Sequence, residues 1–296
     1  DAVRFGGGMG NIERGGEISG LPRCLEGARY STQWYGAPRE VVSIFQGQND
    51  YNDDINCRSL MMNWLAGGSP YVPYQQGLKV PIELSLAVHS DAGYTKDGSL
   101  TGTLGICTTD YKGDTRLNSG LSRSVSKDFA QGIVDQIKND LQSKLNISWS
   151  TRGVWDKNYN ESRRPEVPSA ILEMLSHQNF NDMKFGQDPN FKFTLARAAY
   201  KEITKYIASL HNTTYVIQPL APDHFCTRFI SKGKLQLSWQ PVYDKLESSA
   251  QPTSYIVYTA INNGGFDNGT VVNSTNYTID LEPGSLYRFR VAAINA

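Results

Sequence analysis

Hydrophobic and polar residues alternate along the chain in two patterns. Short apolar runs bounded by turn residues predict buried strands at residues 40–45, 84–88, 102–108 and 170–175. Longer segments with apolar residues at three- and four-residue spacing predict amphipathic helices at residues 54–66, 122–145 and 191–210. Because strands and helices alternate, we expect an α/β fold, a mixed open sheet with helices on both faces.

The pattern changes at about residue 216. From there the chain shows short alternating strands separated by turn residues, and no helical period remains. We therefore predict two domains, an α/β domain over residues 1–215 and an all-β sandwich over residues 216–296.

Composition narrows the range of partners. The 296 residues are 39% hydrophobic and 20% charged, which is typical of a globular protein. Lys and Arg total 29, as do Asp and Glu, and no basic cluster is dense enough to follow a phosphate backbone, which argues against nucleic acid. No run approaches the roughly 18 apolar residues of a membrane span. The four cysteines lack the spacing of a structural zinc site, and nothing indicates an oligomeric state.

Two of the predicted strands deliver a reactive side chain near their ends. His89 follows the run at residues 84–88, and Glu173 lies within the run at residues 170–175. Open α/β sheets place their chemistry at the carboxyl ends of the strands, so we expect both groups at one edge. An imidazole beside a carboxylate suits a hydrolytic metal site, although a single histidine at a strand end is more often structural.

Several motifs in the same order resemble those of the zinc-dependent N-acetylmuramoyl-L-alanine amidases of the amidase_3 type. The resemblance covers residues 50–207. It includes the helix at 54–66, where Asn63 stands in place of the usual arginine. Its other parts are Ser85-Leu-Ala-Val-His89-Ser-Asp-Ala, Arg152-Gly-Val, and Pro168-Ser-Ala-Ile-Leu-Glu173-Met-Leu-Ser-His177 with Asp182.

The resemblance implies hydrolysis of the amide between N-acetylmuramic acid and L-alanine in peptidoglycan. It implies a Zn²⁺ cofactor held by His89 and Glu26, with Glu173 as the catalytic carboxylate. Arg152, His177 and Asp91 are candidates for substrate binding. The expected partner is peptidoglycan or another cell-surface glycan, and the expected location is secreted, periplasmic or in the cell envelope.

The predicted zinc site lacks one ligand of the family. Glu26 begins a segment that is similar to the family's glutamate helix, but Glu13 and Glu17 lie in the same glycine-rich region. The family's first histidine has no counterpart before residue 25, where only Gly6-Gly-Gly-Met-Gly10 is found. Either that histidine precedes Asp1, together with a first strand, or the site has lost it. In the second case the domain is a non-catalytic glycan-binding relic of a hydrolase.

Residues after about 216 resemble a fibronectin type III domain. The resemblance rests on Trp239 in an alternating strand and on the Leu-x-Pro-Gly-x-x-Tyr corner. That corner consists of Leu281, Pro283, Gly284 and Tyr287. The domain is expected to continue past Ala296. Together with the glycine-rich start, it also resembles bacterial proteins described as xanthan-lyase-like, with golvesin-type domains, so polysaccharide elimination is an alternative function.

Overall fold

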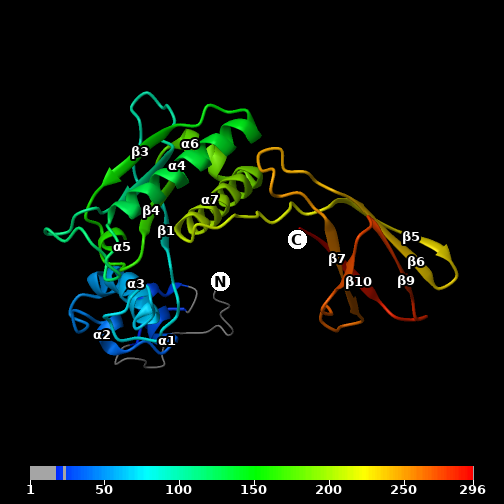
Figure 1. Cartoon of the computed structure of the whole chain (residues 1–296), viewed down its shortest axis with the longest axis horizontal. Helices are drawn as coiled ribbons and strands as arrows, with labels where there is room; N and C mark the ends of the chain where they lie inside the picture. The colour runs from blue at the N-terminus through cyan, green and yellow to red at the C-terminus, as the bar shows by residue number, and fades with distance from the viewer. Residues whose placement is uncertain (1–17, 23–24, 296) are drawn as a thin grey trace. The chain divides into compact units, whose positions relative to one another are not determined.

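The computed structural model describes residues 18–22 and 25–295, so the glycine-rich start with Glu13 and Glu17, and also Cys24, lie outside it. The chain divides into two compact units, Asp1–Ile207 and Ala208–Ala296 (Figure 1). In the part that the structure describes, no helix is long and apolar enough to cross a membrane.

The first unit is built on a four-stranded mixed sheet. Its spatial order is β1 (Ser85–Asp91), β4 (Ser169–Ser176), β2 (Thr103–Cys107) and β3 (Thr151–Asp156). β1 runs parallel to β4, whereas β2 runs antiparallel to β4 and parallel to β3. The predicted α/β fold with a mixed sheet is confirmed, and β3 is a strand that the hydrophobic pattern did not predict.

One face of the sheet carries the main core. α4 (Ser124–Leu145) buries an apolar residue at every fourth position, and α7 (Pro189–Leu210) adds to the same core. The α4 residues are Phe129, Ile133, Ile137 and Leu141. They pack with Ala170 and Leu172 of β4, and each fully buried side chain of this size contributes about 1.5–3 kcal/mol.

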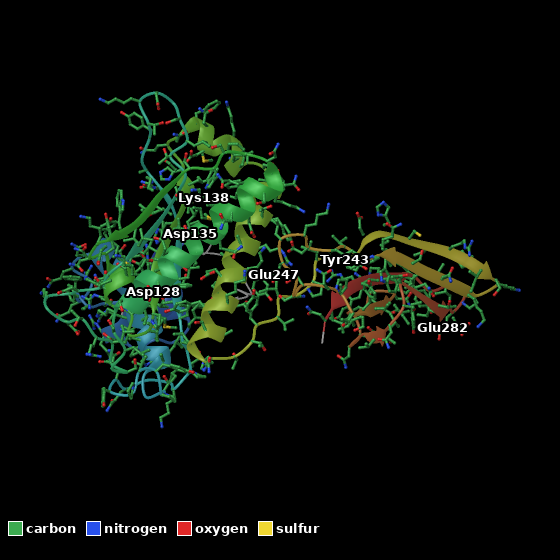
Figure 2. The ribbon with its side chains drawn as sticks, turned by 45° about the horizontal axis from the view of Figure 1, so that its top comes forward. Asp128, Asp135, Lys138, Tyr243, Glu247 and Glu282 are labelled. Carbon is green, nitrogen blue, oxygen red and sulfur yellow. The ribbon has the colours of Figure 1, made fainter. Side chains whose placement is uncertain are left out.

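Charged residues occupy the other side of α4. Figure 2 labels three of them, Asp128, Asp135 and Lys138, along the helix.

A buried ion pair joins α4 and α7, because Lys201 Nζ of α7 lies 2.7 Å from Asp140 Oδ2 of α4. Both side chains are at least nine-tenths buried, so the loss of Lys201 would leave the Asp140 carboxylate buried without this ion-pair partner.

The opposite face of the sheet is covered by shorter elements. Leu104, Ile106 and Ile171 form a small buried cluster there. α5 (Asn160–Arg163) contacts β4 and β2, and α3 (Asp50–Ala66) contacts α5. α6 (Phe180–Gly186) follows β4 and contacts it, but its Met183 and Phe185 pack against the main core instead.

The strand predicted at residues 40–45 is wrong, because the structure places a helix there. α2 (Arg39–Val42) follows Pro38, whose fixed backbone suits the start of a helix, and Glu40 lies in the first turn. Val41 and Val42 are buried against side chains of α3. Val41 and Val42 therefore pack between helices. α1 (Ala28–Trp34) contacts α3 as well.

The second unit is a sandwich of two three-stranded sheets. One has the order β10 (Tyr287–Ile294), β7 (Ser254–Ile261) and β8 (Thr270–Val272). The other has the order β5 (Asp223–Ser231), β6 (Lys234–Gln240) and β9 (Asn276–Asp280). All of its strand pairs are antiparallel.

The sandwich contains the expected tryptophan in its core and the expected corner at a turn. Trp239 of β6 is 4% exposed and stacks edge-on against Tyr255 of β7, with ring centroids 5.3 Å apart. The Tyr287 hydroxyl oxygen accepts a hydrogen bond from the Glu282 backbone N–H at 2.9 Å. This bond fixes the turn between β9 and β10. The two antiparallel sheets confirm the predicted all-β sandwich.

Candidate active site

The strand register brings His89 and Glu173 side by side. His89 of β1 is the direct partner of Glu173 in the parallel β1–β4 pair. Partners in a parallel pair point to the same face of the sheet, here the face of Ala87 and Ile171. On its other side Glu173 is opposite Leu104 of β2. The carboxylate therefore lies between an imidazole and an apolar side chain.

The Glu173 carboxyl group is partly removed from water. Its Oε2 atom is buried and has no hydrogen-bond partner. Burial raises the pKa of Glu173, and the nearby Asp91 raises it further, whereas His89 and Arg152 oppose the shift. A carboxylate with a raised pKa and an unused oxygen is suited to exchange a proton with a bound reactant.

A chain of charged groups holds the imidazole. His89 Nε2 lies 3.0 Å from Glu161 Oε2 of α5. The other carboxylate oxygen, Glu161 Oε1, accepts from Arg58 Nη1 at 3.3 Å, and Arg58 Nη2 donates to Asp54 Oδ2 at 2.9 Å. The hydrogen bond to Glu161 raises the pKa of His89. Sequence reasoning missed Glu161, because α5 is too short to show a helical period, and it missed Arg58, because the partner Glu161 is 103 positions away in the chain.

The Glu161→Gln variant is expected to lower the pKa of His89 in the metal-free protein. The carboxylate stabilises the protonated imidazole, and a neutral amide removes most of that stabilisation. An NMR titration of the His89 ring measures the change. The Glu202→Gln variant, on α7, should leave the His89 titration unchanged. An unaltered His89 pKa in Glu161→Gln would contradict the contact.

Arg152 and Asp91 meet at the same edge of the sheet. Arg152 Nη1 donates to Asp91 Oδ2 at 2.6 Å, and the guanidinium carbon lies 5.5 Å from the Trp155 ring centroid. Arg152 Nε and Nη2 are buried without a hydrogen-bond partner. The charges of Arg152 and Asp91 both shift the pKa of Glu173, so these two predicted substrate-binding residues lie near it.

His177 contacts the end of β1 rather than Glu173. Its Nδ1 atom lies 3.1 Å from both the hydroxyl and the carbonyl oxygen of Ser90, and its backbone N–H donates to the Asp91 carbonyl at 2.9 Å. The side chain is exposed. These contacts join the ends of β1 and β4, and a role for His177 in substrate binding stays a prediction.

The described residues do not complete a zinc site. Glu26 Oε1 accepts from the Ser19 hydroxyl at 2.6 Å. Across residues 18–22 and 25–295, no group of three histidine, cysteine or carboxylate side chains is arranged to hold a metal. Zinc takes about three protein ligands in a catalytic site. His89 with its carboxylate neighbours supplies only part of such a set, and the assignment of Glu26 as a ligand stays a prediction.

Comparison with known proteins identifies the second unit. The family model of the fibronectin type III domain matches residues 210–296. These residues form a fibronectin type III domain. A solved fibronectin domain of human collagen XX is 18% identical, with a TM-score of 0.21. The match covers 27% of this chain and 80% of the collagen domain. No curated protein sequence matches the chain.

Solved amidases are similar to the part of the chain that precedes the fibronectin domain. The CwlD amidase from Clostridioides difficile, solved with the GerS lipoprotein, is 15% identical, with a TM-score of 0.40. The match covers 55% of this chain and 66% of the CwlD chain. An N-acetylmuramoyl-L-alanine amidase from Clostridium difficile 630 is also 15% identical, with a TM-score of 0.38 and coverages of 58% and 80%.

Proposed function

We propose that the chain hydrolyses an amide bond at the site formed by His89 and Glu173. The observation that supports it is the in-register pairing of these residues, together with the unpartnered oxygen of Glu173. The motif order from Ser85 to Asp182 favours one bond, that between N-acetylmuramic acid and L-alanine in peptidoglycan. A secreted, periplasmic or envelope location follows from that substrate.

Glu173 is the general base and acid in this proposal. Its carboxylate accepts a proton from the attacking water, and the raised pKa allows the proton to pass to the departing amine. One carboxylate oxygen accepts a hydrogen bond from the attacking water before the proton is transferred. The two proton transfers balance, because the proton removed from water leaves with the amine.

Arg152 is the proposed donor to the carbonyl oxygen of the substrate amide. An amide offers one acceptor, its carbonyl oxygen, and one donor, its N–H. The buried Nε and Nη2 of Arg152 are unused donors, and Oε2 of Glu173 is an unused acceptor. Asp91 holds the guanidinium through Nη1, and the other two nitrogens have no acceptor in the protein. Donation to the developing oxyanion would stabilise the tetrahedral intermediate.

A bound Zn²⁺, which the motif resemblance implies, would polarise the carbonyl group and acidify a water molecule. The described residues supply too few ligands, so no step above depends on it. The same shortage favours a second candidate, a glycan-binding domain without catalysis. A glycan-binding domain would differ from an amidase in binding peptidoglycan saturably without releasing any product.

Product analysis separates these possibilities. Purified chain is incubated with peptidoglycan, with and without added Zn²⁺. Amide hydrolysis releases new alanine amino termini, which are detected by amine labelling and mass spectrometry. Ultraviolet-absorbing unsaturated sugars would instead indicate a polysaccharide lyase, and binding without product would indicate the glycan-binding domain. Either of these last two results would overturn the proposal.

A further inference from the structure

Three cationic side chains converge beside Tyr111. Arg163 and Arg164 lie at the end of α5, and Lys112 follows Tyr111 in the loop after β2. The Arg163 guanidinium carbon and the Lys112 ammonium each lie 5.5 Å from the Tyr111 ring centroid. A hydrogen bond from Arg163 lowers the pKa of Tyr111, and the charges of Lys112 and Arg164 act in the same direction. Arg163 and Lys112 therefore lie beside the Tyr111 ring, and the charge of Arg164 acts on the same side chain.

The neighbouring carboxylates do not neutralise this cluster. Asp114 and Glu166 both face Arg123, at 3.8 and 3.5 Å. Glu161, on the same helix as Arg163, pairs with His89 and Arg58. Within the described residues, no carboxylate lies within 4.0 Å of the charged nitrogens of the three cations.

Arg164 retains an unused donor inside the cluster. Its Nε atom is buried and has no hydrogen-bond partner. Burial lowers the pKa of Arg164, and the charge of Arg163 lowers it further. Like charges held together, with a buried N–H left unpaired, are unfavourable unless an anion supplies both the charge and the acceptor atoms. Guanidinium groups fit carboxylate and phosphate oxygens in two-point contacts.

We propose that Tyr111, Lys112, Arg163 and Arg164 form a binding site for an oxyanion, a carboxylate or phosphate group carried by a ligand. The site is separate from the hydrolytic residues and does not depend on them. α5 links the two, because Glu161 at its start holds His89 and Arg163 at its end faces Tyr111. An extended anionic substrate could therefore contact both ends of this helix.

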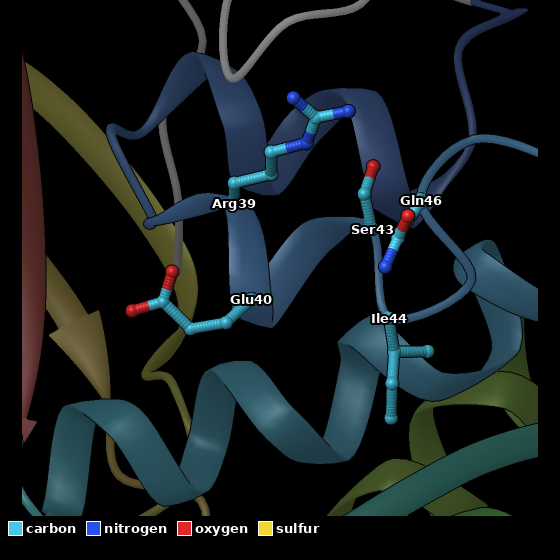
Figure 3. A pocket seen from close by; sticks show the side chains of 5 residues that line it. All are labelled: Arg39, Glu40, Ser43, Ile44 and Gln46. Carbon is cyan, nitrogen blue, oxygen red and sulfur yellow. The ribbon is translucent and has the colours of Figure 1, made fainter.

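A pocket beside α2 lacks this charge imbalance. Figure 3 shows its lining residues, Arg39, Glu40, Ser43, Ile44 and Gln46. The Ser43 hydroxyl already accepts from Arg29 Nη2 at 2.7 Å, and Arg39 and Glu40 carry opposite charges. Unlike the Tyr111 cluster, this pocket offers no uncompensated charge.

Calorimetric titration of the full chain with inorganic phosphate, and separately with acetate, tests the site. The double variant Arg163→Gln/Arg164→Gln is expected to weaken anion binding about tenfold, since it removes charge-assisted hydrogen bonds. The control variant Lys127→Gln/Lys144→Gln removes the same net charge from exposed positions on α4 and should bind as the wild type does. Tighter phosphate binding indicates a phosphate ligand, and equal or tighter acetate binding indicates a carboxylate.

A third variant tests the site even if the double arginine variant fails to fold. Lys112 is exposed and makes no hydrogen bond, so Lys112→Gln should fold and still weaken binding measurably. The Glu173→Gln variant should bind anions normally, which separates this site from the proposed hydrolysis. Absence of saturable binding of both anions, or equal weakening in the Lys127/Lys144 control, would overturn the proposal.

Discussion

Replacement of Glu173 by glutamine is expected to reduce amide hydrolysis by about 10²- to 10⁴-fold, the usual contribution of a general acid–base group. Glutamine has nearly the same shape, but it cannot accept the proton of the attacking water. Its amide also fits the position beside His89 and Leu104, so the strand pairing should persist. The loss should therefore appear in kcat and leave the folded structure unchanged.

The measurement is the rate of alanine amino-terminus release, compared with the wild type at equal protein concentration. Glu202→Gln is the matched control. Glu202 is also a partly buried glutamate whose pKa is raised by burial, but its charged neighbours are Lys205 and Asp135. This control should retain full activity. A Glu173→Gln variant that retains wild-type turnover would show that another group handles the proton.

Replacement of Asp182 by alanine is expected to destabilise the first unit by about 3 kcal/mol or more. The Asp182 side chain is fully buried and accepts three backbone hydrogen bonds. The donors are the N–H groups of Thr101 and Gly102, each at 2.9 Å, and that of Ser176 at 2.8 Å. Hydrogen bonds to a buried charge contribute more than neutral ones, and their loss leaves three N–H groups unpaired.

Urea unfolding of the first unit measures this loss. Asp135→Ala on the exposed side of α4 is the matched control, and it should change the free energy of unfolding by no more than about 0.5 kcal/mol. Asp182 joins the end of β4 to the segment before β2, so its loss should also reduce activity. An unfolding midpoint equal to that of the wild type would contradict this role.

The long periodic elements could be predicted from the sequence, because apolar spacing follows from one buried face. α4 and α7 show this spacing over several turns, and β4 shows an apolar run that only Glu173 interrupts. α2 could not be predicted correctly. Its apolar pair fits a strand equally well, and only packing against α3 decides in favour of a helix.

The site was predictable only where a residue lies within a patterned strand or directly after its apolar run. His89 and Glu173 meet this condition, and the register then places them together. Glu161 does not, because it lies on a four-residue helix and its partner Arg58 is 103 positions away in the chain. The cluster beside Tyr111 likewise joins a loop to the end of α5, and the charges of both segments are unremarkable in the sequence. Contacts of this kind depend on tertiary structure and have no local pattern.

A double-mutant cycle on His89 and Glu173 tests the central claim most directly. The rate of amide hydrolysis is measured for His89→Gln, for Glu173→Gln and for the double variant. Residues that act together at one site lose activity non-additively, so the double variant should be about as impaired as the worse single variant. If the two losses instead multiply, the residues act independently, and a shared active site is contradicted.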